Sequence, residues 1–460
     1  MKTLKKAIII LFITIFFASM GIIGVGCKES ATAAEESATA AEESIDEGFA
    51  INVWVIAGNM GNVFTKAKEV FERDNPNIKV NLNLFDLQSS LEAVAPSALV
   101  SGKEDLNFIV TAADANGFSL IEKGLFKDLT PYIEKYGWFD QQMPGIQDAF
   151  RAKDGKYYFI GSHWDSIPVI WYNSKIFKEV GVEIPKNMDD LFTLCEKIKA
   201  AGYNPISLGN LEKLMGRFFF YTMEQRIMNE DTFKSMLNWV NLSKDEQIEL
   251  AEVYTKELID VYKYLRKMGE AGIFGDVPAT GSLGNMEAQD EYALSKSAMY
   301  ISGTWLAGSL PITYPDFEKN LACFLVPELN GKKEAVSWFS WGMAIPAYVN
   351  DGKEMDILMD FMDTIISNEV TLQYVREGMN PVSTNITSQE RKENGIEVHA
   401  NIIEDMNEAG TFSPFEVKYF PNEVDMLAGW DLSSEVIDGA TSPEDAAQLV
   451  YDKMIDVINE

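Results

Sequence analysis

The sequence predicts an α/β fold built as two lobes, and three observations support this prediction. Near the start of the main body, short β-rich runs alternate with helical patterns in the order strand, helix, strand, helix, strand. A second region with the same kind of alternation begins near Tyr157. The body is about 415 residues long, which is more than one ordinary hydrophobic core holds.

The first region contains three expected strands, at residues 51–56, 78–84 and 107–111. Helical patterns at residues 63–71 and 91–99 separate them, with apolar residues three and four apart in the first of these. This order predicts parallel strands with crossover helices, and ligands of such sheets lie beyond the carboxyl ends of the strands. Asn59 and Asp114 follow two of the strands and are candidate ligand-binding residues. Asp114 could equally cap a helix that begins at Ala115, and Asn59 carries the same ambiguity.

The second region adds further strands and helices of the same class. Asn187 is expected to cap a helix that ends near Gly202, and Ser442-Pro443 with acidic residues behind it opens the last helix. Trp54 and Trp171 fall inside expected strands and are interpreted as core residues. The remaining predicted strands are residues 167–172, 206–208, 297–301 and 341–346, and the remaining helices are residues 187–200, 244–267 and those that run to about 376.

The amino-terminal stretch has the pattern of an export signal. Three lysines precede an apolar run at residues 7–17, and small residues then lead to Cys27. Gly24-Val25-Gly26-Cys27 resembles the bacterial lipobox, although Gly24 stands where a leucine is usual. The resemblance implies a signal peptide at residues 1–26 and a diacylglycerol on the sulfur of Cys27. An uncleaved membrane anchor is the alternative interpretation.

A tether is expected directly after Cys27. Residues 29–44 repeat the unit ESATAAE almost unchanged and contain no large apolar residue, so they cannot offset the cost of ordering a packed core. Residues 27–45 are therefore interpreted as the lipidated cysteine and a flexible linker, with a short helix as the alternative. Either structure would act as a spacer.

Charge and cysteine content exclude several classes of function. The formal net charge is −31, which argues against nucleic-acid binding and against broad contact with anionic lipid. Cys195 and Cys323 each lie in an apolar pattern, which favours buried free thiols over a disulfide. The sequence holds two histidines and none of the usual metal, nucleophile or phosphate motifs, so we expect no catalytic residue, no metal and no cofactor.

Several ordered segments resemble the extracellular solute-binding proteins of family 1, the maltose-binding-protein-like sugar receptors of ABC importers. The resemblance covers about residues 49–460, and its segments are residues 67–80, 124–132, 154–191, 297–305 and 342–346. It implies a periplasmic-binding-protein-like fold of two α/β lobes with mostly parallel sheets. A multi-crossing hinge would join the lobes, and the ligand would lie in the cleft between them. Carried onto this sequence, the lobes would be residues 46–158 plus 343–395 and residues 159–340 plus 396–460.

The resemblance also implies a function. A monomeric, lipid-anchored protein would capture a mono- or oligosaccharide outside the cytoplasm, at the cell surface or in the periplasm, and pass it to the transmembrane subunits of an ABC permease without catalysis. Three alternatives stay open: a non-sugar solute such as glycerol phosphate or a polyamine, a signalling partner in place of the importer, and a secreted glycan-active enzyme.

Candidate ligand-binding residues follow from the chemistry of a sugar, whose apolar C–H faces suit an indole and whose hydroxyl rim suits carboxylates and amides. Trp305 follows a predicted strand at the place where family members often stack a ring. Trp338 and Trp341 flank the start of a strand expected to recross between the lobes, and we expect one of them to face the cleft. For each of these tryptophans the competing interpretation is ordinary core packing.

Other candidates rest on their position relative to the expected crossings. His163, Trp164 and Asp165 lie at the first expected crossing, where a core or loop role is the alternative for His163. Arg217 and Trp430 fall in regions that line the cleft in relatives.

Overall fold

The computed structural model describes most of the chain after residue 48. The described residues are 49–102, 105–113, 115–142, 149–211, 213–239, 242–275, 283–383, 386–412 and 420–460. The expected signal peptide, Cys27, the linker and Asp114 lie outside them, and the side chain of Trp338 is not described either. Among the described residues no helix is long and apolar enough to cross a membrane.

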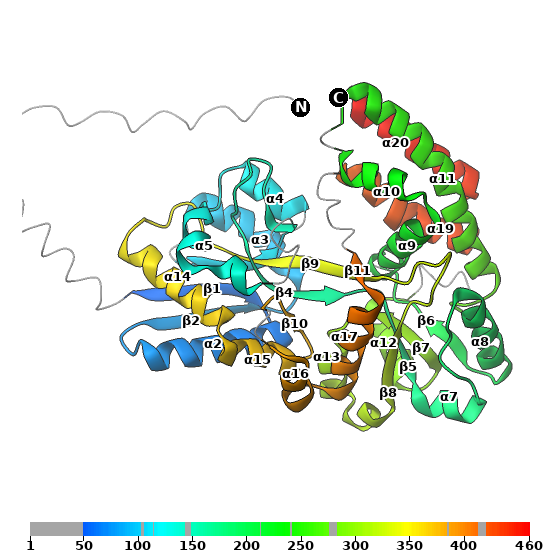
Figure 1. The fold of residues 1–460 in the computed structure, drawn as a ribbon, viewed down its shortest axis with the longest axis horizontal. Helices are drawn as coiled ribbons and strands as arrows, with labels where there is room; N and C mark the ends of the chain where they lie inside the picture. The colour runs from blue at the N-terminus through cyan, green and yellow to red at the C-terminus, as the bar shows by residue number, and fades with distance from the viewer. Residues whose placement is uncertain are drawn as a thin grey trace, which may run out of the picture. The chain divides into compact units, whose positions relative to one another are not determined.

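The larger of two β-sheets forms the frame of the first half of the fold. Its strands run in the spatial order β10-β4-β9-β3-β1-β2, with β11 paired to β9, and Figure 1 shows this sheet running through the left half of the view. The strands are β1 (Ala50–Ile56), β2 (Lys79–Phe85), β3 (Phe108–Ala112), β4 (Ile160–Ser166), β9 (Ala335–Ala344), β10 (Asn380–Pro381) and β11 (Thr411–Phe412).

Helices pack against this sheet where its strands are buried on both sides. Every residue of β3 is buried, whereas only Val80 is buried in β2 at the sheet edge. Phe71 of α2 and Phe108 of β3 both meet the ring of Phe361 of α14 edge to face, at centroid distances of 5.2 and 5.3 Å. Burying a ring of this size contributes about 1.5–3 kcal/mol, so this cluster is a main source of stability here.

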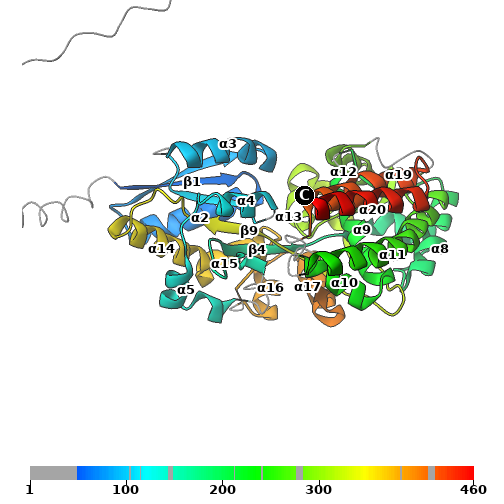
Figure 2. The ribbon, with the colours of Figure 1, turned by 90° about the horizontal axis from the view of Figure 1, so that it is seen from above.

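The helices that accompany the larger sheet come from both ends of the sequence, and Figure 2 shows α14 and α15 beside α2. They are α2 (Asn59–Asp74), α3 (Gln88–Ser101), α4 (Ala115–Glu122), α5 (Thr130–Tyr136), the 3-10 turn η1 (Trp138–Gln141), α14 (Lys353–Ile366), α15 (Asn368–Arg376) and α16 (Ser388–Asn394).

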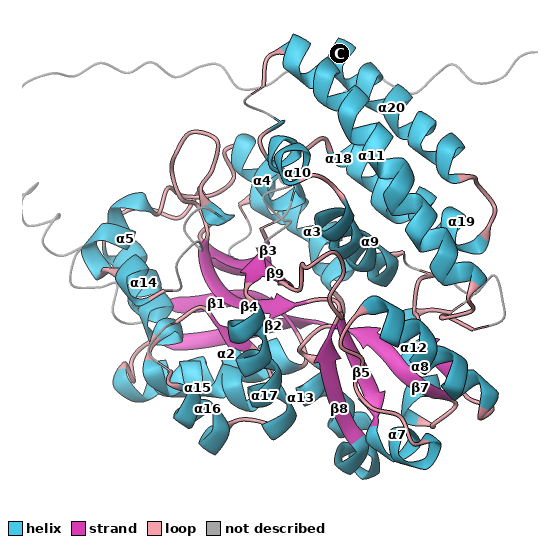
Figure 3. Cartoon of the chain, turned by 45° about the vertical axis from the view of Figure 1, so that its right-hand side comes forward, coloured by secondary structure: helices cyan, strands magenta, loops and turns pink. Residues whose placement is uncertain are grey.

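The smaller sheet has the strand order β6-β7-β5-β8 and lies among helices on the other side of the molecule (Figure 3). Its strands are β5 (Val169–Asn173), β6 (Asn204–Ser207), β7 (Ser297–Ser302) and β8 (Leu321–Leu325). Trp171 of β5 is fully buried, as predicted for a core residue, and so is Trp54 of β1 at 3% exposure.

The helices associated with the smaller sheet include the long α11, which lies beside the carboxyl-terminal helix α20 (Figure 1). These helices are α7 (Ser174–Val180), α8 (Met188–Ala200), α9 (Leu214–Ile227), α10 (Glu230–Leu237), α11 (Lys244–Glu270), α12 (Asn285–Ala293), α13 (Leu306–Thr313), η3 (Pro315–Asn320), α17 (Glu397–Ala409), α18 (Asn422–Asp425), the π-helix η5 (Met426–Leu432), α19 (Ser433–Asp438) and α20 (Pro443–Asn459).

Local sequence signals set several of these boundaries as predicted. The Asn187 side chain accepts a hydrogen bond from the Asp190 amide at the start of α8, and Ser442 accepts one from the Asp445 amide at the start of α20. Such caps are worth about 1 kcal/mol each. Cys195 and Cys323 are free thiols, and burial raises the pKa of Cys195 to about 12.

The expectation of mostly parallel sheets needs correction, because both sheets are mixed. Parallel pairing holds for β2-β1-β3, as the strand–helix alternation predicts, and for β6-β7. The strands β4 and β9, however, run antiparallel to each other, and β5 runs antiparallel to both of its neighbours. β4 leads directly into β5 of the smaller sheet, so a strand that joins the two halves of the fold replaces a crossover helix at this point.

Candidate functional site

The paired strands β4 and β9 bring together the candidates predicted at the two crossings. His163 faces Trp341 in the register of the pair, and Asp165 faces Trp338. The register shifts on either side of His163, so β4 is irregular at this point. Irregularities of this kind turn side chains away from the regular alternation and are frequent beside binding sites. Residues about 180 positions apart in the sequence are therefore neighbours.

The Asp165 carboxylate ties three separate segments together in the interior. Its Oδ1 accepts a hydrogen bond from Thr304 Oγ1 at 3.2 Å, and its Oδ2 lies 3.3 Å from His163 Nε2. Thr304 Oγ1 in turn accepts from the Ser166 amide at 3.2 Å and from Asn380 Nδ2 at 3.4 Å. Thr304 and Asn380 are fully buried, so this network holds β4, β10 and the turn after β7 in a fixed relation.

His163 lies in a stack of aromatic rings. Its ring is nearly parallel to the rings of Trp341 and Tyr374, at centroid distances of 6.2 and 5.7 Å. His163 Nδ1 also lies 3.0 Å from Ser162 Oγ. Because His163, Trp164 and Trp341 are all less than 10% exposed, these three side chains are packed among other residues in this conformation.

Trp305 is more exposed than those residues. Its ring can lie where it does because Gly303 has no side chain. A Cβ added to Gly303 would lie 2.0 Å from Cζ3 of the Trp305 ring, so the indole rests directly on the glycine backbone. The Gly303 carbonyl accepts a hydrogen bond from Trp171 Nε1 at 3.1 Å, which fixes the turn against the core. The sequence Gly303-Thr304-Trp305 therefore presents a half-buried indole from a rigid base.

Asn59 lies close to the helix that Trp305 precedes. Its Nδ2 donates to the carbonyl of Glu377 at 2.8 Å, and a Cβ added to Gly308 of α13 would lie 3.0 Å from the same nitrogen. The start of α2, the end of α15 and α13 thus meet at Asn59. The side-chain oxygen of Asn59 is not used by that hydrogen bond.

Arg217 and Trp430 meet beside a buried polar group. The guanidinium carbon of Arg217 lies 4.9 Å from the centre of the Trp430 ring and 5.1 Å from that of Tyr221. Arg217 also forms an ion pair with Asp425, which accepts a hydrogen bond from Tyr221 as well. Burial raises the pKa of Tyr221 well above its usual value, so its hydroxyl stays a donor.

Trp430 belongs to η5, the π-helix at Met426–Leu432. Helices of this type are rare and often lie at functional sites. The indole N–H of Trp430 is buried and has no hydrogen-bond partner among the described residues. A buried indole donor without a partner is a reason to place a ligand or water near Trp430.

Sequence reasoning missed Thr304, Asn380, Tyr221, Asp425 and His399. Most of them act through contacts between distant segments, which composition and spacing do not show. His399 on α17 is the second histidine of the sequence, and it is buried. Its burial, together with Arg391, lowers its pKa to about 4, while Asp165 acts in the opposite direction.

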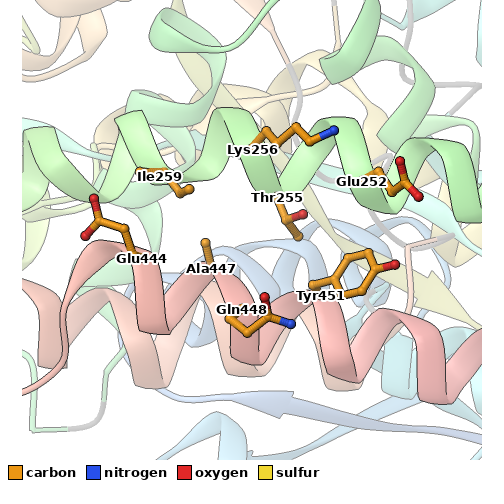
Figure 4. Close-up of a pocket in the computed structure, with 8 residues that line it drawn as sticks. All are labelled: Glu252, Thr255, Lys256, Ile259, Glu444, Ala447, Gln448 and Tyr451. Atoms are coloured by element: carbon orange, nitrogen blue, oxygen red, sulfur yellow. The ribbon is translucent and has the colours of Figure 1, made fainter.

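A groove between α11 and α20 lies outside this site. Figure 4 shows Thr255, Lys256 and Ile259 of α11 facing Ala447, Gln448 and Tyr451 of α20 across it. None of the predicted ligand-binding residues lines it. Within the described part of the chain, no group of three or more histidine, cysteine or acidic side chains is arranged to hold a metal ion.

Comparison with known proteins identifies the family. The sequence pattern of the family described as bacterial extracellular solute-binding protein matches residues 57–371, which is more than half of the chain. This chain belongs to that family. It is a family of binding proteins rather than enzymes.

Individual relatives match shorter stretches. An uncharacterized ABC transporter extracellular-binding protein of Pyrococcus horikoshii is 28% identical over 192 residues, which are 40% of this chain and 42% of that protein. A probable sugar-binding periplasmic protein of Mesorhizobium japonicum is 31% identical over 102 residues, 22% of this chain and 24% of the relative. The chain thus spans less than half the length of these curated relatives.

Solved structures confirm the fold over nearly the whole described chain. A chitin oligosaccharide binding protein superposes with a TM-score of 0.73 at 16% identity, covering 90% of this chain and all of that one. A maltose-bound protein of T. maritima gives a TM-score of 0.69 at 13% identity, with coverage of 89% and 100%. At these identities the likeness shows the periplasmic-binding-protein-like α/β fold that the sequence predicted, here with two mixed sheets.

Proposed function

We propose that this protein is the carbohydrate receptor of an ABC importer, held outside the cell by a lipid on Cys27. The observation that carries the proposal is the half-buried Trp305 indole on its glycine base, beside the polar network of Thr304 and Asp165. A flat apolar face next to fixed donors and acceptors matches the two kinds of surface that a sugar ring presents.

The relatives support the same assignment. Two curated relatives are described as an ABC transporter extracellular-binding protein and as a probable sugar-binding periplasmic protein. The structural neighbours include proteins described with chitin oligosaccharide and with maltose. An extracellular binding protein hands its solute to a membrane permease, and we propose that the transmembrane subunits of an ABC permease are the partner here.

The proposed mechanism is closure of two lobes around the ligand. We propose residues 46–158 plus 343–395 as one lobe and residues 159–340 plus 396–460 as the other, with β4 and β9 crossing between them. A ligand that contacts both lobes stabilises the closed conformation and shifts the population towards it. Trp305 would cover one face of the sugar, and polar side chains would bind its hydroxyl groups. The proposed ligand-binding residues are those of the sequence analysis: Asn59, Asp114, His163, Trp164, Asp165, Arg217, Trp305, Trp338, Trp341 and Trp430.

A binding screen tests this function. The mature chain from residue 27, carrying Cys27→Ser so that it stays free of lipid, is screened by thermal shift with mono-, di- and oligosaccharides, glycerol phosphate and spermidine. A ligand at 100 times its Kd stabilises the folded state by about 2.7 kcal/mol, which a melting curve resolves. We expect one or more carbohydrates to raise the Tm and to bind at one-to-one stoichiometry without turnover. A response to spermidine or glycerol phosphate alone would reject the carbohydrate assignment.

The lipid anchor has its own test. Wild-type protein expressed in a bacterial host should incorporate labelled palmitate and remain with the membrane fraction, because a lipid chain contributes about 0.8 kcal/mol per buried methylene. Cys27→Ser should abolish the label and release the protein. A Cys195→Ser variant is the matched control and should keep the label. Equal labelling of the Cys27→Ser variant would contradict lipidation at this residue.

A further inference from the structure

A hollow of about 580 Å³ lies between elements of the larger sheet and elements packed around the smaller one. Part of its lining comes from α4 and the segment before β4, and the rest comes from the segment after α10 and the segment before α18. Its volume is in the range of about 300–1,000 Å³ that is typical of ligand pockets. None of the residues predicted from the sequence lines it.

The wall on the side of the larger sheet is apolar with a polar rim. Phe118 and Ile121 of α4 are three residues apart, share one face of the helix and are both half-buried. Glu122, the next residue, is exposed at the same edge. This arrangement offers an apolar surface with a carboxylate beside it.

Tyr158 and Asp154 add hydrogen-bond acceptors, because the one Tyr158 hydroxyl proton is already donated to Asp154. The Tyr158 hydroxyl donates to Asp154 Oδ2 at 2.7 Å, while Asp154 Oδ1 accepts the amide of Lys156 at 3.0 Å. Burial and the neighbouring Asp154 raise the pKa of Tyr158 to about 12, so the phenol is neutral at physiological pH. Both residues reach the hollow, and the half-buried Tyr158 ring extends its apolar wall.

The part of the lining that comes from Trp239 and Phe420 is aromatic and tightly packed. Trp239 and Phe420 meet edge to face at a centroid distance of 5.5 Å, and Phe420 also packs against Tyr254 at 5.7 Å. Both residues are about 5% exposed, so they form a fixed backing for the hollow. The rim carries the Glu122 and Asp154 carboxylates and the Lys153 ammonium, so charges of both signs surround the aromatic lining. Apolar aromatic faces beside mixed polar groups suit the apolar face and the hydroxyl rim of a neutral pyranose ring better than an ion of either sign.

Packed side chains link α4, which lines the hollow, to strand β9 of the candidate site. This helix begins at Ala115, directly after the predicted ligand residue Asp114, and a rise of 1.5 Å per residue puts Phe118 and Ile121 roughly 6–10 Å further along. Phe118 meets Phe159 edge to face at 6.0 Å, and Phe159 lies against Gly342, the residue after Trp341. One ligand that reached both places would therefore be longer than a single sugar ring.

We propose that this hollow is a second sugar subsite and that the ligand is an uncharged oligosaccharide of at least two rings. The first ring binds at Trp305, and a later ring lies between Phe118 and Tyr158 on one side and the Trp239–Phe420 wall on the other. The proposal rests on the proposed function and adds the class of carbohydrate.

The test is a chain-length series measured by calorimetric titration. The sugar type found in the binding screen is titrated as monosaccharide, disaccharide, trisaccharide and tetrasaccharide into wild type, Phe118→Ala and Tyr158→Ala. Both side chains are half-buried, so their removal leaves the core intact. Tyr451→Ala is the matched control, because Tyr451 is also half-buried but lines the groove between α11 and α20 (Figure 4).

We expect wild-type affinity to rise tenfold or more between the monosaccharide and the longer sugars. Phe118→Ala and Tyr158→Ala should each lower the affinity for the longer sugars at least fivefold and leave the affinity for the monosaccharide unchanged. Tyr451→Ala should bind every sugar as wild type does. Equal affinity for all chain lengths, or loss of monosaccharide and oligosaccharide binding by the same factor, would overturn the second subsite and leave the carbohydrate function standing. Absence of binding to every carbohydrate would overturn both.

Discussion

Substituting alanine for Gly303 should displace the Trp305 ring without altering any group that contacts the ligand directly. The added Cβ would lie 2.0 Å from Cζ3 and 2.4 Å from both Cε3 and Cη2 of the indole. Because carbon atoms in contact are about 3.5–4.0 Å apart, the ring must move by roughly 1.5 Å or change rotamer. Gly303 does not have a positive φ, so the alanine causes no strain in the backbone itself.

The expected effect is a loss of ligand affinity. Fully covering an aromatic side chain is worth about 1.5–3 kcal/mol, and the Trp305 ring is already half-buried, so a ligand gains about half of this and we expect a loss of roughly 1 kcal/mol. This corresponds to a roughly fivefold increase in Kd. Isothermal titration with the carbohydrate found in the screen measures it directly.

Two further variants make this prediction specific. Gly61→Ala is the control, because a Cβ there meets its nearest neighbours at 3.4 Å, an ordinary contact, and should leave the Kd unchanged. The double variant Gly303→Ala/Trp305→Ala should bind no more weakly than Trp305→Ala alone, since both changes remove the same contact. Wild-type affinity in Gly303→Ala, or full additivity in the double variant, would refute the reasoning.

Two predictions concern stability. Burial raises the pKa of Glu224 from 4.5 to about 8, so the free energy of unfolding of wild type should fall as the pH rises from about 4.5 to 8. Glu224→Gln keeps an acceptor for the Tyr254 hydroxyl but cannot ionise. At pH 8 the free energy of unfolding of this variant should exceed that of wild type by on the order of 4 kcal/mol. Urea unfolding at pH 5 and pH 8 measures this, and a difference between the two proteins that does not change with pH would contradict it. Thr304→Val should lower the free energy of unfolding by about 1–3 kcal/mol, because it leaves the Ser166 amide and the Asp165 carboxylate without their buried partner. The exposed Thr193→Val should stay within about 0.5 kcal/mol of wild type, and equal stability of both variants would argue against the network.

Much of the fold was predictable because its signals are local. The alternation of residues 51–111 predicted the parallel unit β2-β1-β3, and the side chains of Asn187 and Ser442 predicted where α8 and α20 begin. The mixed character of the sheets was not predictable in this way. It depends on β4 and β9, which run antiparallel although about 180 residues separate them.

In the candidate site, too, residues marked by local sequence signals could be selected from the sequence, and residues that act through long-range contacts could not. Trp305 and Trp341 were identifiable because they lie at the ends or crossings of predicted strands. Asn380 and Asp425 were not, since their roles depend on contacts to residues far away in the sequence, Thr304 for Asn380 and Arg217 for Asp425. The Trp239–Phe420 wall was missed for the same reason, because its two residues lie apart in the sequence and neither ends a predicted strand.

Small-angle X-ray scattering of the lipid-free mature protein, with and without the carbohydrate found in the screen, measures whether the two halves of the fold close on a sugar. Closure around a ligand in the cleft predicts a smaller radius of gyration at saturating sugar and no change with spermidine. A sugar that binds one to one yet leaves the scattering curve unchanged would contradict the closure mechanism.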